Sequence, residues 1–389
     1  MQRKGDKIMK FQTMAATSPF KIDVRYEYNL LSGDLAGICY MPNDFKDLIQ
    51  QPKQKKSDRA ELAKKNGHHS VFDHEYITIY LEDVPKMFAM LLNNEKVYAT
   101  SEKSARYTKM QSDGLEYDLY TKWQKIFIKL ISEKYPNHPY FTPKKIEKLA
   151  LENARYFLSV YTPTSFAYTA SYRQLSYIYS YLKNLQNSKS DLLLNLIPTS
   201  IEFCDYLEKN HLIDKTIASF AENREFSLIA KKEREEYFGD VYSTSYYGSF
   251  AQFAQAQRHR SLNYEIEELN FNSFYIPKII KNMPDLKQEW ITDMIKVSSA
   301  VPQGKIIKIY ERGTPENFIL KLNERLCSQA QLEICQQTEQ TLLKYINNTT
   351  DEQIKNMLSK YSKGARCKNG FNCPSPCGFG DGINLQREI

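Results

Sequence analysis

Apolar residues recur at helical spacing in several stretches of the chain and alternate with polar residues in others. A spacing of three to four residues predicts amphipathic helices, whereas short runs of β-branched and aromatic residues predict strands. The predicted strands are 74–81 and 305–310. The predicted helices are 84–99, 123–134, 143–157, 168–185, 245–259 and 315–345. This mixture predicts an α+β fold.

The same order of elements occurs twice along the chain. Residues 66–110 read as strand, helix and polar loop, and residues 237–275 repeat that order. Residues 151–185 and 298–335 each lead from a short irregular segment into a long helix. We therefore interpret the chain as two tandem copies of one module, with two unrelated α+β domains as the alternative. The predicted modules are 1–214 and 215–389, the second ending in a Cys-rich tail at 364–389.

Composition and charge narrow the classes of protein. A chain of 389 residues exceeds what one core usually serves, and a hydrophobic content of 42% can fill two cores. No run approaches the roughly 18 apolar residues of a membrane span, and no signal-peptide core follows the basic start, so we expect a cytoplasmic protein. The net charge of +7 is spread over mixed-sign stretches, so we expect neither a nucleic-acid nor a membrane partner.

Three of the seven cysteines cluster near the C-terminus. An odd number of cysteines without a secretory signal argues against a disulfide framework. Cys367, Cys373 and Cys377 are candidate zinc ligands if Cys327 or Cys335 supplies the fourth. A reduced tail without metal is the alternative, because three ligands do not complete a tetrahedral site.

The stretch "NGHHSVFDHEYITIYLEDVPKMFAMLL" with the later "SEKSARY" resembles the flavin-dependent thymidylate synthases. In that family a Gly-His and a Phe-acid-His cluster precede a strand, a helix and a Glu-x-Ser-x-Arg-Tyr loop. Ala105 stands where the loop usually has Gly, and Asp73 stands where the cluster usually has Glu. The resemblance implies the family's fold, an antiparallel sheet with long helices. The matching residues are His68, Ser70, Asp73, Glu102, Ser104, Arg106 and Tyr107.

The family's flavin-gripping Arg-His-Arg triplet is intact in the second copy only. It reads Arg258, His259 and Arg260 and follows Gln255, where the family has a nucleotide-binding Gln. The first copy has Asn94, Glu95 and Lys96 in its place. In exchange, the loop positions of the second copy hold Ile266, Glu268 and Asn270 instead of Glu, Ser and Arg.

The end of each copy shows the same division. Arg155 matches the family's phosphate-side Arg, and Ser171 and Arg173 match its flavin-contacting Asn-x-Arg with one substitution. The second copy has Ser298 and Glu316 in place of Arg155 and Arg173. Conversely, the base-reading Arg and its following Ala-Gln-x-Glu-Ile occur in the second copy with Arg325, where the first copy has Leu182. The two copies have therefore lost complementary residues.

In this family each nucleotide site is shared between two subunits, so the resemblance implies a composite site for deoxyuridylate (dUMP) and FAD. Arg325 is the candidate that polarises the pyrimidine carbonyls. Ser104 is the second catalytic candidate, although the sequence identifies no base that would make it a nucleophile. The predicted dUMP contacts are Glu102, Ser104, Ala105, Arg106, Arg155, Gln255, Arg258 and Arg325. The predicted FAD contacts are His68, Ser70, Asp73, Ser171, Arg173, Arg258, His259 and Arg260.

The implied reaction is reductive methylation of dUMP at C5, with methylenetetrahydrofolate and NADPH as cosubstrates and a flavin as hydride carrier. Two chains of two modules would rebuild the four-module assembly of the family, which predicts a homodimer. One alternative is an enzyme of the same fold that acts on another pyrimidine nucleotide or transfers another group. The other is a catalytically inactive, nucleotide-binding paralogue.

Overall fold

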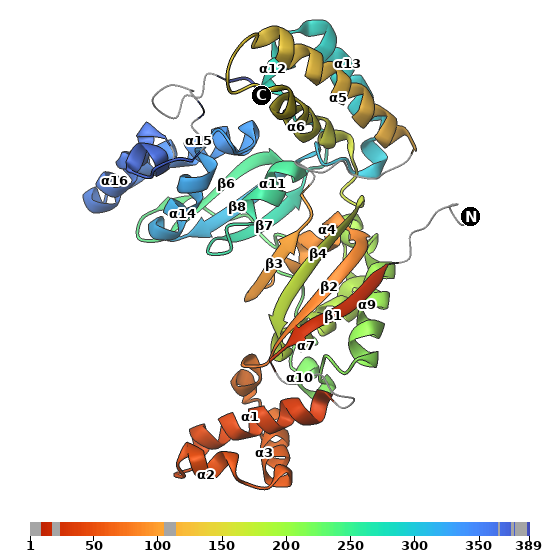
Figure 1. The fold of residues 1–389 in the computed structure, drawn as a ribbon, viewed down its shortest axis with the longest axis vertical. Coiled ribbons are helices and arrows are strands. Elements are labelled where there is room, and N and C mark those ends of the chain that lie inside the picture. The colour runs from red at the N-terminus through yellow and green to blue at the C-terminus, as the bar shows by residue number, and fades with distance from the viewer. Residues whose placement is uncertain (1–8, 18–23, 105–113, 365, 375–376, 378–386) are drawn as a thin grey trace. The chain divides into compact units, whose positions relative to one another are not determined.

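The computed structural model describes residues 9–17, 24–104, 114–364, 366–374, 377 and 387–389. The chain forms two compact units (Figure 1). The first unit comprises Met1–Lys103 and Pro163–Ser227, and the second comprises Ser104–Thr162 and Leu228–Ile389. These units differ from the predicted modules mainly in residues 104–162, which belong to the first module in sequence but pack within the second unit. The predicted modules concern a duplication of the sequence, and they stay a prediction.

The first unit is built on a four-stranded antiparallel sheet with the order β1-β2-β4-β3. Alternate residues of β2 are buried, among them Ile77, Ile79 and Leu81, so one face of the sheet forms the core. Helices α7 and α9 pack together behind this face (Figure 1). The strands are β1 (Lys10–Ala16), β2 (Tyr76–Pro85), β3 (Tyr98–Glu102) and β4 (Pro163–Ser171).

The helices of the first unit fall into two groups. In one group, α4 (Lys86–Leu92) and α7 (Tyr172–Lys183) contact the sheet, and α9 (Ile197–Lys209) and α10 (Lys215–Ser219) pack against α7. The short helix α8 (Asp191–Leu194) lies between α7 and α9 in the chain. The other group precedes the sheet's second strand: α1 (Val24–Tyr40), α2 (Phe45–Ile49), α3 (Lys53–Lys65) and the 3₁₀ turn η1 (His69–Asp73).

The second unit holds another four-stranded antiparallel sheet, with the order β5-β6-β8-β7. Its strands are β5 (Tyr237–Phe238), β6 (Tyr242–Ser249), β7 (Asn263–Glu268) and β8 (Ile306–Gly313). The helices around it are α11 (Phe250–Ala256), α14 (Pro315–Arg325), α15 (Leu332–Asn348) and α16 (Glu352–Ser359).

A further group of helices lies within the second unit (Figure 1). Their buried side chains form an aromatic core. Trp123 and Trp290 meet edge to face with ring centroids 4.8 Å apart. Asp293 accepts a hydrogen bond of 3.1 Å from the indole of Trp123, so the polar atom of this buried ring is satisfied. The helices are α5 (Gly114–Lys134), α6 (Pro143–Ala154), α12 (Lys278–Lys281) and α13 (Pro284–Lys296).

The two sheets share one register. Phe166 of β4 lies opposite Leu81 on one side and Glu102 on the other. Ile309 of β8 likewise lies between Tyr246 and Ile266. Glu102 and Ile266 therefore hold the same place in their sheets, as the sequence alignment of the two predicted copies implies.

The segments that precede β4 and β8 pair with each other inside the second unit. These segments contain the 3₁₀ turns η2 (Arg155–Phe157) and η4 (Ser298–Ala300). Ser159 and Pro302 form an antiparallel bridge. On its two sides, Val160 N donates to Val301 O at 2.9 Å and Gln303 N donates to Leu158 O at 2.7 Å. The pairing is reciprocal about Ser159 and Pro302.

Several predicted helices were placed too broadly. Residues 168–171 and 245–249 continue strands, and each helix begins only after a serine that caps it, Ser171 and Ser249. Strand β3 begins within the predicted helix 84–99, and the predicted helix 315–345 is two helices, α14 and α15. The apolar spacing at these junctions fits both periods, so only tertiary pairing decides.

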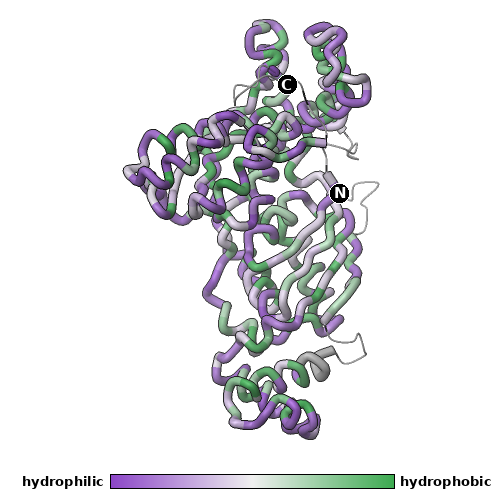
Figure 2. The backbone as a smooth tube through the Cα atoms, turned by 60° about the vertical axis from the view of Figure 1, so that its left-hand side comes forward, coloured by the Kyte–Doolittle hydropathy of each residue, from purple (hydrophilic) through white to green (hydrophobic). Residues whose placement is uncertain are grey.

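Hydrophobic and hydrophilic stretches alternate along the chain in both units (Figure 2). Among the described residues, no helix combines the length and the apolar character that crossing a membrane requires.

Candidate functional site

Arg155 and Gln255, one from each predicted copy, meet at a single side chain in the second unit. Arg155 Nη2 donates a hydrogen bond of 2.5 Å to Oε1 of Gln331 and one of 3.2 Å to the carbonyl of Ala251. Gln255 Nε2 donates to the same Oε1 atom. Arg155, Gln255 and Gln331 are all buried, so the guanidinium is held in a fixed position. The sequence predicted both Arg155 and Gln255 as dUMP contacts.

Gln331 and Glu333 link Arg155 and Gln255 to Tyr156 and to Ser249 at the end of β6. Gln331 Nε2 donates to the hydroxyl of Tyr156 at 2.5 Å, and this hydroxyl donates to Glu333 at 2.7 Å. Glu333 also accepts from the backbone N and the hydroxyl of Ser249, which caps the helix that carries Gln255. Burial raises the pKa of Glu333. Gln331 and Glu333 belong to the Ala-Gln-x-Glu-Ile motif, but the sequence did not predict a role for either residue.

The base-reading candidate Arg325 and the flavin candidate His259 are in direct contact. Arg325 lies in the last turn of α14 and donates from Nε to His259 Nε2 at 2.7 Å. Burial, aided by the charges of Arg325 and Lys321, lowers the pKa of His259 to about 2. The imidazole is therefore neutral and carries its proton on Nδ1.

A buried ion pair lies one helical turn before Arg325. Lys321 Nζ is 2.6 Å from a carboxylate oxygen of Glu311, and both side chains are fully buried. Glu311 also accepts hydrogen bonds of 2.7 Å from the hydroxyls of Tyr242 and Tyr246. These bonds offset part of the cost of burying a carboxylate.

The Arg-His-Arg triplet lines a cleft of about 570 Å³ in the second unit. The opposite lining comes from α14 and from residues beyond α16, which the sequence reasoning did not assign to a site. The cleft combines three guanidinium groups with one carboxylate and two aromatic rings. The lining residues are Arg258, His259, Arg260, Ser261, Leu320, Asn323, Glu324, Tyr361, Arg366, Asn369 and Phe371.

In the first unit, three predicted flavin contacts lie together. Asp73 accepts a hydrogen bond of 2.8 Å from the hydroxyl of Ser171 and one of 2.7 Å from Arg173 Nη1. The guanidinium of Arg173 also lies over the ring of Tyr177, 5.4 Å from its centroid. Ser171 additionally caps α7 by accepting from Gln174 N at 3.1 Å. The start of α7 and the end of η1 are thereby fixed to each other.

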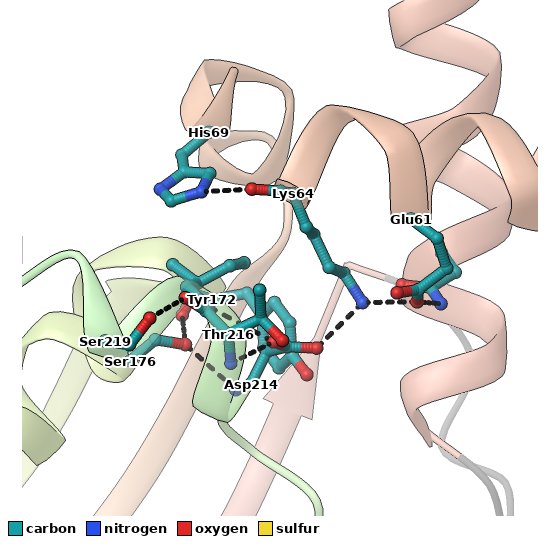
Figure 3. A network of polar contacts seen from close by, with 10 residues as sticks. Glu61, Lys64, His69, Tyr172, Ser176, Asp214, Thr216 and Ser219 are labelled. Carbon is teal, nitrogen blue, oxygen red and sulfur yellow. Dashed lines mark hydrogen bonds and ion pairs between the residues drawn. The ribbon is translucent and has the colours of Figure 1, made fainter. Parts of the chain in front are cut away.

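A buried polar network holds η1 in place (Figure 3). His69 contacts the carbonyl of Lys64 at 3.0 Å and the hydroxyl of Tyr177 at 3.1 Å. Lys64 in turn pairs with Asp214 at 2.7 Å. Burial alone would raise the pKa of Asp214, but the ammonium group of Lys64 and further hydrogen bonds outweigh it, so the pKa is lowered. The buried histidine is therefore His69, whereas the predicted His68 lies with its ring 5.4 Å from that of Tyr40 and Ser70 is exposed.

The loop of the first copy is only partly described. Glu102 ends β3 and pairs with Lys86 at 2.5 Å, and it accepts a hydrogen bond of 3.2 Å from Thr164. Ser104 is the last described residue of the loop. The predicted contacts Ala105 and Arg106 lie outside the described residues.

In the first unit, two of the three triplet positions hold an uncharged and an acidic side chain in place of basic ones. Asn94 and Glu95 take the places of Arg258 and His259, and both bind Ser227. Burial raises the pKa of Glu95. Leu91 and Leu182, which replace Gln255 and Arg325, are core residues.

The cysteines of the tail form no preformed metal site in the part of the chain that the structure describes. No three His, Cys, Asp or Glu side chains come together there as metal ligands. Cys335 is buried on α15, and burial raises the pKa of its thiol to about 12. A buried protonated thiol is a poor fourth ligand, so zinc at Cys367, Cys373 and Cys377 stays a prediction of the sequence alone.

The fold and the buried site define an α+β protein with two sheets of equal topology and a cationic cleft. Residues 31–185 match the family model described as thymidylate synthase complementing protein. The resemblance predicted from the first-copy motifs is thus confirmed for this part of the chain. Comparison with curated protein sequences gave no match.

Solved structures with a similar arrangement include a UMP/dUMP methylase, PolB, from Streptomyces cacaoi bound with 5-Br dUMP. It is 12% identical, with a TM-score of 0.35, covering 56% of this chain and 96% of that one. Thymidylate Synthase X from Helicobacter pylori with FAD and dUMP is 14% identical, with a TM-score of 0.32, covering 54% and 99%.

Proposed function

We propose that this protein is a flavin-dependent enzyme that methylates dUMP at C5, built from two tandem copies of one module. The observation that carries the proposal is the convergence of Arg155 and Gln255 on Gln331. A nucleotide phosphate needs fixed cations and donors, and a guanidinium held by a buried amide provides them. Glu102, Ser104, Ala105 and Arg106 are proposed to complete the nucleotide site, as the family pattern implies.

Two features support the duplication. The sheets have the same strand order and the same register. The reciprocal pairing about Ser159 and Pro302 is what two equivalent segments that pair with each other would produce. Homodimerisation, which would rebuild a four-module assembly, is proposed on the same ground.

The residues present fit a flavin cofactor. Arg258 and Arg260 line the cleft and suit the negative charge of a pyrophosphate. When bound, the flavin would supply the hydride, with NADPH as reductant and methylenetetrahydrofolate as one-carbon donor. Arg325 would place a positive charge beside the pyrimidine carbonyls, and the neutral His259 keeps that guanidinium oriented.

The visible spectrum of the purified protein and calorimetric titration with dUMP test the proposal. We expect a flavin absorption band and saturation at one nucleotide per chain, because only the second unit keeps the Gln and Arg of the triplet helix. Nucleotide binding without flavin would favour the inactive paralogue. Binding of two nucleotides per chain would contradict the complementary loss of residues.

A further inference from the structure

The chain continues beyond the repeated elements into a short C-terminal segment that packs back on α14. Helix α16 contacts α14 and α15, and a 3₁₀ turn, η6 (Arg366–Asn369), also contacts α14. Gly364 and Gly370, on either side of this turn, have φ angles of 116° and 92°. Residues other than glycine rarely adopt such angles, so the two glycines set the direction of the turn.

The turn directs Arg366 into the cleft. The backbone N of Phe371 donates to the carbonyl of Arg366 at 3.1 Å, which closes the turn. The guanidinium of Arg366 lies 3.9 Å from the centroid of the Phe371 ring. Both side chains line the same cleft as Arg258 and Arg260.

Arg366 has the properties of an anion-binding residue. No carboxylate among the described residues pairs with it, in contrast to Arg173 in the first unit, which pairs with Asp73. Stacking on Phe371 restricts the guanidinium plane while its N–H groups stay available along the edge. A restricted guanidinium loses less conformational entropy when it binds a phosphate than a free one does.

We propose that Arg366, held by Phe371, binds the pyrophosphate of the flavin dinucleotide as a third cation beside Arg258 and Arg260. This inference rests on the proposed flavin cofactor. It assigns a part of the cofactor site to the C-terminal tail of the second predicted module, outside the segments that recur in both modules. The remaining carboxylate of the cleft, Glu324, leaves a net positive lining.

Titration of the full-length protein with FAD, followed by quenching of flavin fluorescence, tests this assignment. We expect Arg366→Ala to raise the Kd for FAD at least about tenfold, because hydrogen bonds to charged groups contribute about that much. Arg366→Lys should retain part of the affinity, and Phe371→Ala should weaken binding less than Arg366→Ala does. Riboflavin, which has no phosphate, should bind the wild type and Arg366→Ala equally.

Lys368→Ala is the matched control, because this cation lies on the same turn but does not line the cleft. It should bind FAD like the wild type. Unchanged FAD affinity in Arg366→Ala, with wild-type protein that binds FAD, would overturn the inference and leave the proposed function standing. If the wild type binds no FAD, the proposed function fails, and titration with inorganic pyrophosphate then decides the role of Arg366. Equal pyrophosphate affinity of wild type and Arg366→Ala would again overturn it.

Discussion

The cores of the two sheets differ in polarity at equivalent positions. In the second unit, Glu311 and Lys321 form a buried ion pair that two tyrosine hydroxyls complete. In the first unit the same places hold Tyr168 and Ile178, and the places of the two tyrosines hold Ile77 and Leu81. All four of these residues are buried. One backbone arrangement thus supports both a polar and an apolar core.

The difference in polarity between the two cores correlates with the presence of the proposed site beside the core. A buried ion pair seldom stabilises a fold more than well-packed apolar residues of similar size. The second unit nevertheless keeps its pair directly before Arg325, whose contact with His259 belongs to the proposed site. At the corresponding places the first unit has Leu182 and Glu95, and Glu95 binds Ser227 instead. The polar core therefore accompanies the proposed ligand-binding residues, and the unit without them has an apolar core.

The largest effect is expected from breaking the ion pair. Lys321→Ile should lower the free energy of unfolding by about 3 to 5 kcal/mol, because it leaves the charge of Glu311 buried without a counterion. Grafting the complete apolar set of the first unit, as Tyr242→Ile, Tyr246→Leu, Glu311→Tyr and Lys321→Ile together, should restore most of this loss. Urea unfolding measures both. A graft less stable than the single variant would show that the two cores are not interchangeable.

Removal of Arg155 should weaken dUMP binding by about 2 to 5 kcal/mol, because the substitution takes away a buried charged partner. Its counterpart in the second copy, Ser298→Ala, should have little effect on binding. Calorimetry on samples with matched melting temperatures measures the affinities, and Arg155→Lys serves if Arg155→Ala does not fold. Equal losses from Arg155 and Ser298 variants would contradict the division between the copies.

The buried His259 of the second unit should make the stability of the protein depend on pH. Burial and the neighbouring Arg325 lower its folded-state pKa to about 2, whereas the pKa of the unfolded imidazole is about 6.5. Below the unfolded value the unfolded chain takes up a proton that the folded chain excludes. The free energy of unfolding should therefore decrease as the pH is lowered below this value, by up to about 1.4 kcal/mol per pH unit. His259→Gln should show a shallower decline between about pH 6.5 and about pH 4.5 in denaturant titrations; identical slopes would argue against the buried neutral imidazole.

The smallest effect on stability is expected at the half-exposed ion pair of the first unit. Arg173→Ala breaks the contact with Asp73, whose side chain is 45% exposed, and should cost about 0 to 1 kcal/mol. If Arg173 contacts the flavin as the family pattern implies, the same variant should lower FAD affinity without changing the melting temperature. Unchanged FAD affinity would limit Arg173 to anchoring α7 on η1.

Sequence patterns alone were sufficient to propose an alignment of the two predicted copies. The hydrophobic period and the order of motifs aligned Glu102 with Ile266 in sequence. In the two sheets these residues pair with Phe166 and Ile309, which occupy equivalent positions. The triplet also follows α11, and Arg325 ends α14. These features are local, because capping residues and apolar spacing act within a few residues of the chain.

Which side chains complete the candidate site depends on tertiary contacts. Gln331 binds both Arg155 and Gln255, which are far from each other in sequence. Arg366 likewise lines the same cleft as the distant Arg-His-Arg triplet. The packing of residues 104–162 in the second unit was equally hidden. Such contacts depend on how distant segments pair and on which polar groups must be satisfied when they are buried together. No local pattern encodes that choice.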